Sequence, residues 1–246
     1  DQNGDGFIDL VTMEPGQNLD TFGSFRVNHL RGGLVGDQGD APDSGPGTGP
    51  GNYNTHWTDN GPVHMTANTY WANGGLRVTG GTSLVYLGAR HASAEAVAGA
   101  NLLANGDNDD GIVDPVTTLA LTGGEAATID VGVTNASTQT ANLYGWIDSN
   151  LDGVFDNETE RASVEVPVGM SAAEGDSVSL VFENIPSGID VQTYSRFRIG
   201  ADEATGNPTG VAGDGEVEDY VVTITSPTTV VLKESVEYQV PSLDYG

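Results

Sequence analysis

The sequence predicts an all-β protein whose strands pack as a sandwich, and two observations support this. The 246 residues include 35 glycines, and short apolar runs alternate with Gly, Asn, Asp and Ser, the residues that build turns. The chain is also long enough to bury a hydrophobic core. The clearest strands are six segments of about 6 to 9 residues, at roughly 127–134, 142–148, 162–168, 177–185, 194–201 and 218–225.

The alternation within these segments predicts which side chains face the core. Val178, Leu180 and Phe182 share one face of their strand, because successive residues of a strand point to opposite sides. Phe197 and Ile199 share one face of another strand. We therefore expect these five side chains to lie in the core.

Segment 142–148 is apolar on both faces, with Leu143 on one and Trp146 on the other, which predicts a central strand. Trp146 is expected to be buried in the core rather than to contact a ligand. Arg196 and Arg198 lie opposite the apolar face of their strand, where they face either solvent or acidic neighbours. We expect structural ion pairs there.

The charge of the chain excludes several classes of partner. Only 8 Lys and Arg residues face 35 Asp and Glu residues, for a formal charge of −27. Nucleic-acid binding needs clustered basic side chains, so it is not expected, and anionic membranes are disfavoured for the same reason. No stretch approaches the roughly 20 apolar residues of a membrane span. Self-repulsion on this scale opposes compaction unless cations bind.

The first ten residues, DQNGDGFIDL, place side-chain oxygens at positions 1, 3, 5 and 9 around a glycine at position 6. The same pattern returns in DSNLDGVFD, which begins at residue 148. Calcium takes six to eight oxygen ligands, and loops of this pattern supply most of them. The candidate ligands are Asp1, Asn3, Asp5 and Asp9 in the first loop, and Asp148, Asn150, Asp152, Asp156 and Glu160 in the second.

The usual glutamate at position 12 is replaced by Thr12 and Thr159. This departure argues against a helix–loop–helix sensor and for a rigid loop between strands. The alternative is that Asp, Asn and Gly only form turns here.

A third acidic cluster, GDNDDGIVD at residues 106–114, has irregular spacing. It binds calcium with partners from elsewhere in the chain, or it is a solvated acidic turn; the high negative charge favours calcium. Catalytic patterns are lacking: there is no H-E-x-x-H, G-x-S-x-G or phosphate-binding glycine loop, and the four histidines lack the spacing of a zinc site. We therefore expect no enzyme.

Three further segments frame the strands. Residues 36–90 are rich in Gly, Pro, Asn and Asp and are expected to wrap the sandwich. Residues 91–104 have the only composition suited to a helix, although Gly99 interrupts it. Residues 226–246 are β-prone and form a last strand, a linker, or a strand lent to a neighbour, with 230–240 as the donated part.

Several sequence blocks occur in the order of a known family. They are GDAPDS (39–44), YLGARHASAE (86–95), GDNDDGI (106–112), GWIDSNLDGVFDNETE (145–160), YSRFRIG (194–200) and DGEVEDYVVTI (214–224). Over about residues 36–225 the chain resembles the GEVED domain of bacterial secreted and cell-surface proteins. The resemblance implies an extracellular β-sandwich repeat and implies no catalysis. The chain departs from the family at Ser93-Ala94-Glu95 and by a long insertion before residue 86.

The last block also suggests a shared ion. Glu216, Glu218 and Tyr220 point to one face of their strand, and Asp219 points to the other. Either these carboxylates are solvated at the start of the strand, or they bind one cation together with the blocks at 39–44 and 106–112. We favour the shared cation. The proposed set is Asp40, Asp43, Asp107, Asp109 and Glu216.

Together these observations predict an immunoglobulin-like or jelly-roll-type β-sandwich with long calcium-binding loops. We expect a junction segment at 1–35, the GEVED-type domain at 36–225 and a strand or linker at 226–246. The final residues LDYG are similar to the start of a family domain, so a following copy is expected. The expected function is a calcium-stabilised structural module of an exported bacterial surface polymer, adhesin or fibre, which contacts copies of itself. The alternative is a carbohydrate-binding module that stacks glycans on Trp57, Tyr70 and Trp71.

Overall fold

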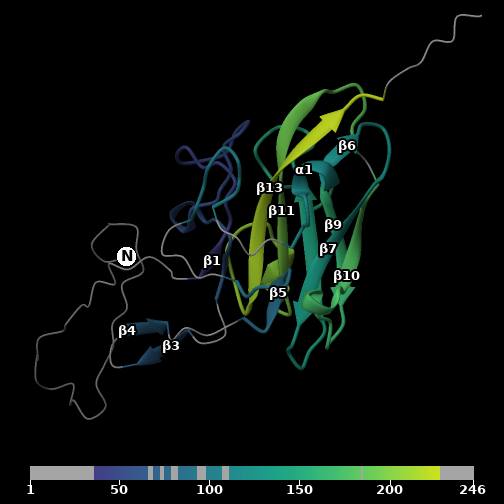
Figure 1. The fold of residues 1–246 in the computed structure, drawn as a ribbon. Coiled ribbons are helices and arrows are strands. Elements are labelled where there is room, and N and C mark those ends of the chain that lie inside the picture. The colour runs from purple at the N-terminus through teal and green to yellow at the C-terminus, as the bar shows by residue number, and fades with distance from the viewer. Residues whose placement is uncertain are drawn as a thin grey trace, which may run out of the picture.

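The computed structural model describes residues 36–65, 69–72, 75–78, 83–92, 98–106, 111–183 and 185–227. Four sets of predicted positions lie outside these ranges: the first candidate calcium loop (Asp1 to Asp9), Asp107 and Asp109, the departure at 93–95, and segment 230–240. The described part is an all-β sandwich, as the sequence predicted, with an additional layer on one side (Figure 1). The finer assignment to an immunoglobulin-like or jelly-roll type remains a prediction.

The larger sheet has five strands in the order β6-β13-β11-β8-β9. Their bounds are β6 Ala120–Thr122, β13 Gly215–Thr225, β11 Val191–Gly200, β8 Ala141–Ile147 and β9 Arg161–Val166. All neighbours are antiparallel except β6, which runs parallel to β13. Strand β8 lies inside this sheet, as its two apolar faces predicted.

The smaller sheet has three antiparallel strands in the order β10-β7-β5. Their bounds are β10 Ser177–Phe182, β7 Ala127–Asn135 and β5 Val85–Leu87. The main core lies between the two sheets and includes Leu180, Phe182, Phe197 and Ile199, with Val178 partly buried against it. The faces assigned from the alternation are therefore confirmed.

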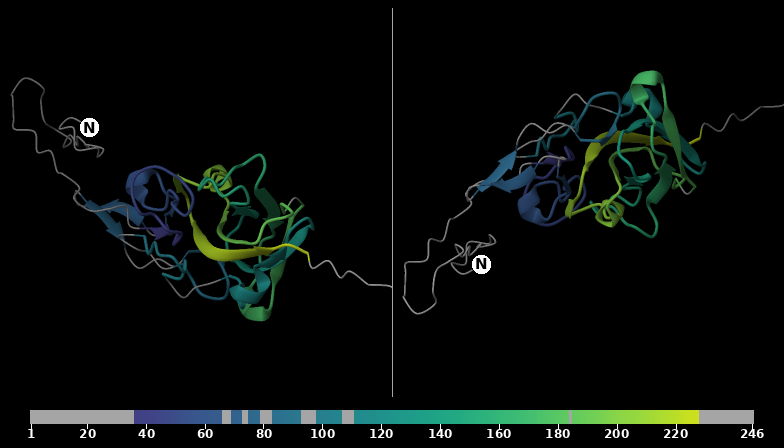
Figure 2. Two further views of the ribbon diagram at one scale, coloured as in Figure 1. Left: turned by 90° about the horizontal axis from the view of Figure 1, so that it is seen from above. Right: turned by 90° about the horizontal axis from the view of Figure 1, so that it is seen from below.

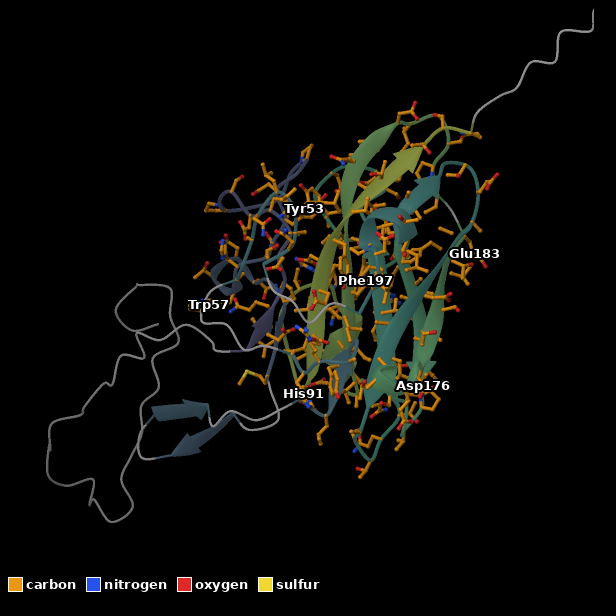
Figure 3. All side chains as sticks on the ribbon, viewed as in Figure 1. Tyr53, Trp57, His91, Asp176, Glu183 and Phe197 are labelled. Carbon is orange, nitrogen blue, oxygen red and sulfur yellow. The ribbon has the colours of Figure 1, made fainter. Side chains whose placement is uncertain are left out.

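Residues 36–65 cover the other face of the five-stranded sheet (Figure 2). This outer layer contains β1 (Asp37–Gln38), β2 (Val63–His64) and the 3₁₀ turn η1 (Trp57–Asp59), and β12 (Val211–Ala212) joins β2 in parallel. A second, smaller core forms beneath it from Ala41, Tyr53, Trp146 and Phe155. Figure 3 shows Tyr53 on the side of this layer and Phe197 between the two sheets. The expectation that residues 36–90 wrap the sandwich is met by 36–65 but not by β5, which is itself a strand of the smaller sheet. Trp146 is buried as predicted.

The remaining elements are short. β3 (Thr69–Ala72) pairs with β4 (Gly75–Val78), and single turns form α1 (Pro115–Thr118), η2 (Ala172–Glu174) and η3 (Glu203–Gly206). The helix expected over 91–104 does not form in its described part, since 98–104 contains only a turn at Leu102 and Leu103, and 93–97 lies outside the described residues. Among the described residues no helix has the length and hydropathy needed to cross a membrane.

Three of the six predicted strands differ from the observed ones by three residues at one end, and the other three agree within two residues at each end. β11 begins at residue 191 instead of 194, β13 begins at 215 instead of 218, and β10 ends at 182 instead of 185. The added starts of β11 and β13 contain polar residues such as Thr193 and Glu216, which are buried. The alternation of apolar residues does not extend to these positions, although the strand pairing does.

Candidate functional site

The acidic motif at the start of β13 places carboxylates on both faces of the five-stranded sheet. Glu216, Glu218 and Tyr220 lie on the face toward the main core, and Asp219 lies on the face toward the outer layer, as the alternation predicted. All four side chains are at most 3% exposed. The motif therefore acts where three layers of the protein meet.

On the inner face, the motif closes the edge of β5. Gly88 N donates to the carbonyl of Gly132 in β7, so the N–H of the preceding Leu87 points away from β7. That N–H donates instead to Oε2 of Glu216. Asp214 binds the residues just before β5, because its carboxylate accepts from the Ser83 hydroxyl at 2.8 Å and from Leu84 N at 2.9 Å. Side-chain oxygens of Asp214 and Glu216 thus accept hydrogen bonds from backbone N–H groups at this edge, as the carbonyls of a neighbouring strand would.

On the outer face, Asp219 forms a two-point ion pair with Arg196. Arg196 Nε lies 2.7 Å from Oδ1, and Nη2 lies 2.8 Å from Oδ2. Oδ2 also accepts from the backbone N of Asp40 at 2.9 Å and of Ala41 at 2.8 Å. Both charged side chains have no exposed surface. The predicted ion pair of Arg196 is confirmed, and it fastens the outer layer to the sheet.

Arg198 binds a histidine and backbone carbonyls instead of the acidic partner that was expected. Its Nε donates to Nε2 of His64 at 3.0 Å, and its Nη1 donates to the carbonyl of Asn207 at 2.6 Å. Burial lowers the pKa of Arg198 to about 9, with a smaller contribution from the nearby charge of Arg196. Within the described residues the recorded ion pair is that of Arg196 with Asp219.

His64 is fully buried between Arg198 and the carbonyl of Gly213, which lies 3.1 Å from Nδ1. Because a carbonyl only accepts and a guanidinium only donates, the ring is neutral with its hydrogen on Nδ1. Burial holds the pKa of His64 well below its usual range, and the charge of Arg198 lowers it further. Gly215 packs against this ring so closely that a Cβ there would lie 2.4 Å from Nδ1 and 2.1 Å from the carbonyl oxygen of Ile199.

The second predicted calcium loop connects β8 to β9, as expected for a loop between strands. Asp148 is fully buried, and its two oxygens accept from Asp152 N at 3.2 Å and Gly153 N at 3.0 Å. Asn150 Oδ1 also accepts from Asp152 N, at 2.9 Å. Backbone donors at positions 5 and 6 thus orient the side chains at positions 1 and 3, and Asn150 and Asp152 remain exposed.

The end of this loop is tied back by Glu160. Its Oε1 accepts from Ser149 N at 2.8 Å and its Oε2 accepts from Asp156 N at 3.0 Å. Burial raises the pKa of Glu160, against the opposing effect of these N–H donors. Asp156 accepts from the N–H groups of Thr159 and Glu158, and these bonds lower its pKa. All five predicted residues thus lie in one loop, although no three of its carboxylates are grouped in the described structure so as to hold a metal ion.

The proposed shared set is only partly within the described residues. Asp40 Oδ2 accepts from Gly106 N at 2.6 Å, directly before the third acidic cluster, whereas Asp43 Oδ2 accepts from His56 N at 2.8 Å. Glu216 binds β5. In the described ranges, no three His, Cys, Asp or Glu side chains are grouped so as to hold a metal ion. Since Asp107 and Asp109 lie outside them, the shared site remains a prediction.

Sequence reasoning missed two contacts of the outer layer, one with the β8–β9 loop and one with β13. The Tyr53 hydroxyl donates to Asp148 Oδ2 at 2.6 Å, and burial raises the pKa of that phenol. Asp37 of β1 accepts from Val217 N at 2.5 Å. Each pair is separated by about a hundred residues or more, so no local pattern in the sequence indicates it. The sequence did offer one indication for Tyr53. It is an aromatic residue in a segment too polar to form a core alone, so its ring had to pack against another part of the protein.

The geometry defines a class of all-β sandwich proteins whose layers are joined by an acidic motif on one strand. The model of the GEVED domain family matches residues 142–223. This segment, which runs from β8 into β13, is a GEVED domain, and over these residues the resemblance noted in the sequence is confirmed. The search of curated proteins and the search of solved structures found no match.

Proposed function

We propose that this chain is a calcium-stabilised, non-catalytic structural module of an exported bacterial surface polymer, adhesin or extracellular fibre. It is repeated in tandem or assembled end to end outside the cell. The observation that carries the proposal is the β8–β9 loop, in which oxygen-bearing side chains at positions 1, 3, 5 and 9 are already oriented by backbone donors. The negative charge of −27 supports it, because bound cations would offset the self-repulsion.

The residues of the loop suit a calcium ion chemically. A carboxylate has about four lone-pair positions, so a hydrogen bond to one of them leaves others for a metal. Leu151 and Gly153 have φ of 65° and 78°, and these left-handed residues give the chain the tight path that such loops require. Asp148, Asn150, Asp152 and Asp156 would supply side-chain oxygens, and Glu160 would orient the loop or join them.

Calcium bound here would stiffen more than one element. Gly153 packs against Gly49 so closely that a Cβ would lie 1.9 Å from the Gly49 oxygen, and Tyr53 binds Asp148. The loop therefore contacts the outer layer while it connects two strands of the large sheet. The first loop (Asp1 to Asp9) and the shared set around Asp40 belong to the same proposal as further calcium sites.

The test is a calcium titration by calorimetry of the full chain and of two variants. Asp152→Asn keeps the shape of an exposed loop side chain but removes its charge, and we expect calcium affinity at that site to fall at least about tenfold, since affinity depends on ligand charge. Asp130→Asn, on the exposed face of β7, is the matched control and should bind as the parent does. Equal calcium binding by all three proteins would refute the role of the loop.

The assembly is tested by electron microscopy of the native material, which should show fibres or continuous arrays rather than isolated particles. For the carbohydrate-binding alternative, Trp57 lies in the outer layer, and the side chains of Tyr70 and Trp71 lie outside the described set. A glycan array signal that Trp57→Ala abolishes would favour that alternative.

A further inference from the structure

Strand β9 forms an edge of the five-stranded sheet, next to β10, which is an edge of the other sheet. In the part of the chain that the structure describes, β9 has hydrogen-bonded strand partners only in β8. Ile147 N donates to the carbonyl of Glu160, so the ladder to β8 uses every second residue from Glu160. The backbone groups of Arg161, Ser163 and Glu165 therefore point away from the sheet. An edge of this kind is a template for another strand.

A hollow of about 310 Å³ opens between the start of β9 and the end of β10. Its apolar lining includes Ile147, Phe182 and Ile185, and its polar lining includes Glu160 and Glu183. Figure 3 shows Glu183 on the side of the molecule opposite Trp57 of the outer layer. An incoming strand on β9 would place one of its faces toward this hollow.

The chain itself contains a segment whose pattern matches this edge. Residues 230–240 read VVLKESVEYQV, with apolar residues at 230, 232, 236, 238 and 240 and polar residues at 233, 235, 237 and 239. Glu234 interrupts the apolar set and Val231 the polar set. Lys233 is the only lysine of the chain. This alternation is that of a strand with one buried face.

We propose that residues 232–238 of a second copy of this chain add to β9 as an antiparallel strand, with Ser235 opposite Ser163. This register places Lys233 opposite Glu165 and Glu237 opposite Arg161, so both charged pairs attract. A parallel strand centred on the same serines would place Lys233 beside Arg161 and Glu237 beside Glu165, and both pairs would repel.

The same register directs the apolar face inward. Leu232, Val236 and Tyr238 come opposite Val166, Ala162 and Glu160. Val166 and Ala162 belong to the main core, and Glu160 is buried at the end of the β8–β9 loop. Tyr238 then lies at the hollow, where its ring can cover Phe182 and its hydroxyl can donate to a carboxylate of the lining. Glu234 faces Val164, which is only partly buried.

The segment of the same chain cannot reach this position. Through the register of β9, β8, β11 and β13, Glu165 lies at the same height in the sheet as Gly215, the first residue of β13. Thr225, at the end of β13, is therefore ten residues along the strand from the height of Glu165. That separation is about 33 Å, with about 14 Å more across three strand spacings. These components combine to about 36 Å, whereas the eight residues from Thr225 to Lys233 span at most about 29 Å. A second copy must therefore supply the strand.

The absence of cysteine from the chain permits a direct cross-linking test. Residues that exchange backbone hydrogen bonds across antiparallel strands have Cα atoms about 5.5 Å apart, which suits a disulfide. We expect a mixture of Ser163→Cys and Ser235→Cys chains, oxidised together, to give a disulfide-linked pair of chains. A mixture of Ser163→Cys with Ser242→Cys is the control and should give at least tenfold less. Equal yields from the two mixtures, or an internal disulfide within a single chain carrying both Ser163→Cys and Ser235→Cys, would overturn the proposal.

A charge exchange tests the register. Glu165→Lys and Lys233→Glu should each weaken self-association about tenfold in sedimentation, and the chain carrying both should regain it. Glu125→Lys, at an exposed turn, is the control for net charge. Failure of the double variant to recover would contradict the pairing.

The inference rests on the proposed assembly of copies but not on calcium. Cross-linking without calcium binding would refute the role of the metal alone. Calcium binding without cross-linking would refute the added strand alone.

Discussion

Asp219 shows how this protein uses a buried acidic residue. Its carboxylate accepts from two guanidinium nitrogens of Arg196 and from the backbone of Asp40 and Ala41, so one side chain joins β13, β11 and the outer layer. A buried carboxylate is stable only when it is paired and hydrogen-bonded. Glu216, Asp214 and Asp37 serve other backbone donors in the same way. The surplus of acidic residues therefore has a structural use in addition to any role in binding metal.

Replacement of Asp219 by alanine should strongly destabilise the fold. It would leave the buried guanidinium of Arg196 without its charge partner, and breaking a buried pair in this way costs about 3–5 kcal/mol. Urea unfolding should show this loss, whereas Asp130→Ala, which removes an exposed partner of Ser179, should cost about 1 kcal/mol or less. A loss at Asp219 no larger than that of the control would contradict the account.

His64 makes the stability of the fold depend on pH. Its pKa in the folded protein lies below the ordinary value of 6.5, so below pH 6.5 the unfolded chain binds a proton that the folded protein does not. Stability from this group is therefore complete above pH 6.5 and is lost as the pH falls, by at most about 1.4 kcal/mol per pH unit. Unfolding measured from pH 7 to 5 should lose this slope in His64→Gln and keep it in His56→Gln. An unchanged slope in His64→Gln would count against the buried neutral ring.

At the scale of elements, the β8–β9 loop should be sensitive to a methyl group at Gly153. This glycine has φ of 78°, and an added Cβ would collide with the Gly49 backbone. Gly169 has φ of 88° but open space around it. Gly169→Ala should thus lose only the cost of the backbone conformation, about 1–2 kcal/mol, and Gly153→Ala should lose more in thermal or urea unfolding. Equal losses would mean that the loop does not press on the outer layer.

The elements also show what the sequence can and cannot predict. Alternating apolar residues predicted strands such as β10 and the facing of Phe197 and Ile199. The spacing of Asp and Asn around a glycine predicted the loop at 148–160. Short elements without a pattern, such as β5, β6 and α1, were not predicted, because three or four residues carry no periodicity. The pairing of Tyr53 with Asp148 and of His64 with Arg198 depends on tertiary contacts over long separations, which a local pattern does not record. Arg198 was for that reason assigned the wrong kind of partner.

For the whole molecule, the acidic motif and the β8–β9 loop act at two places on one sheet that separates two cores. The motif fastens β5 on one side and the outer layer on the other, and the loop contacts the outer layer again at Gly49 and Tyr53. The layers are thus joined by hydrogen bonds of side chains and backbone and not by disulfides, which a chain without cysteine cannot form.

The central proposal is that calcium stabilises this module, and the melting temperature of the full chain in calcium and in EDTA tests it most directly. An ion bound only by the folded state stabilises it by about 2.7 kcal/mol per site at a hundred times the dissociation constant. We predict a melting temperature several degrees higher in calcium, with little change in magnesium, and a smaller increase for Asp152→Asn. The same melting temperature in calcium and in EDTA would contradict the proposal.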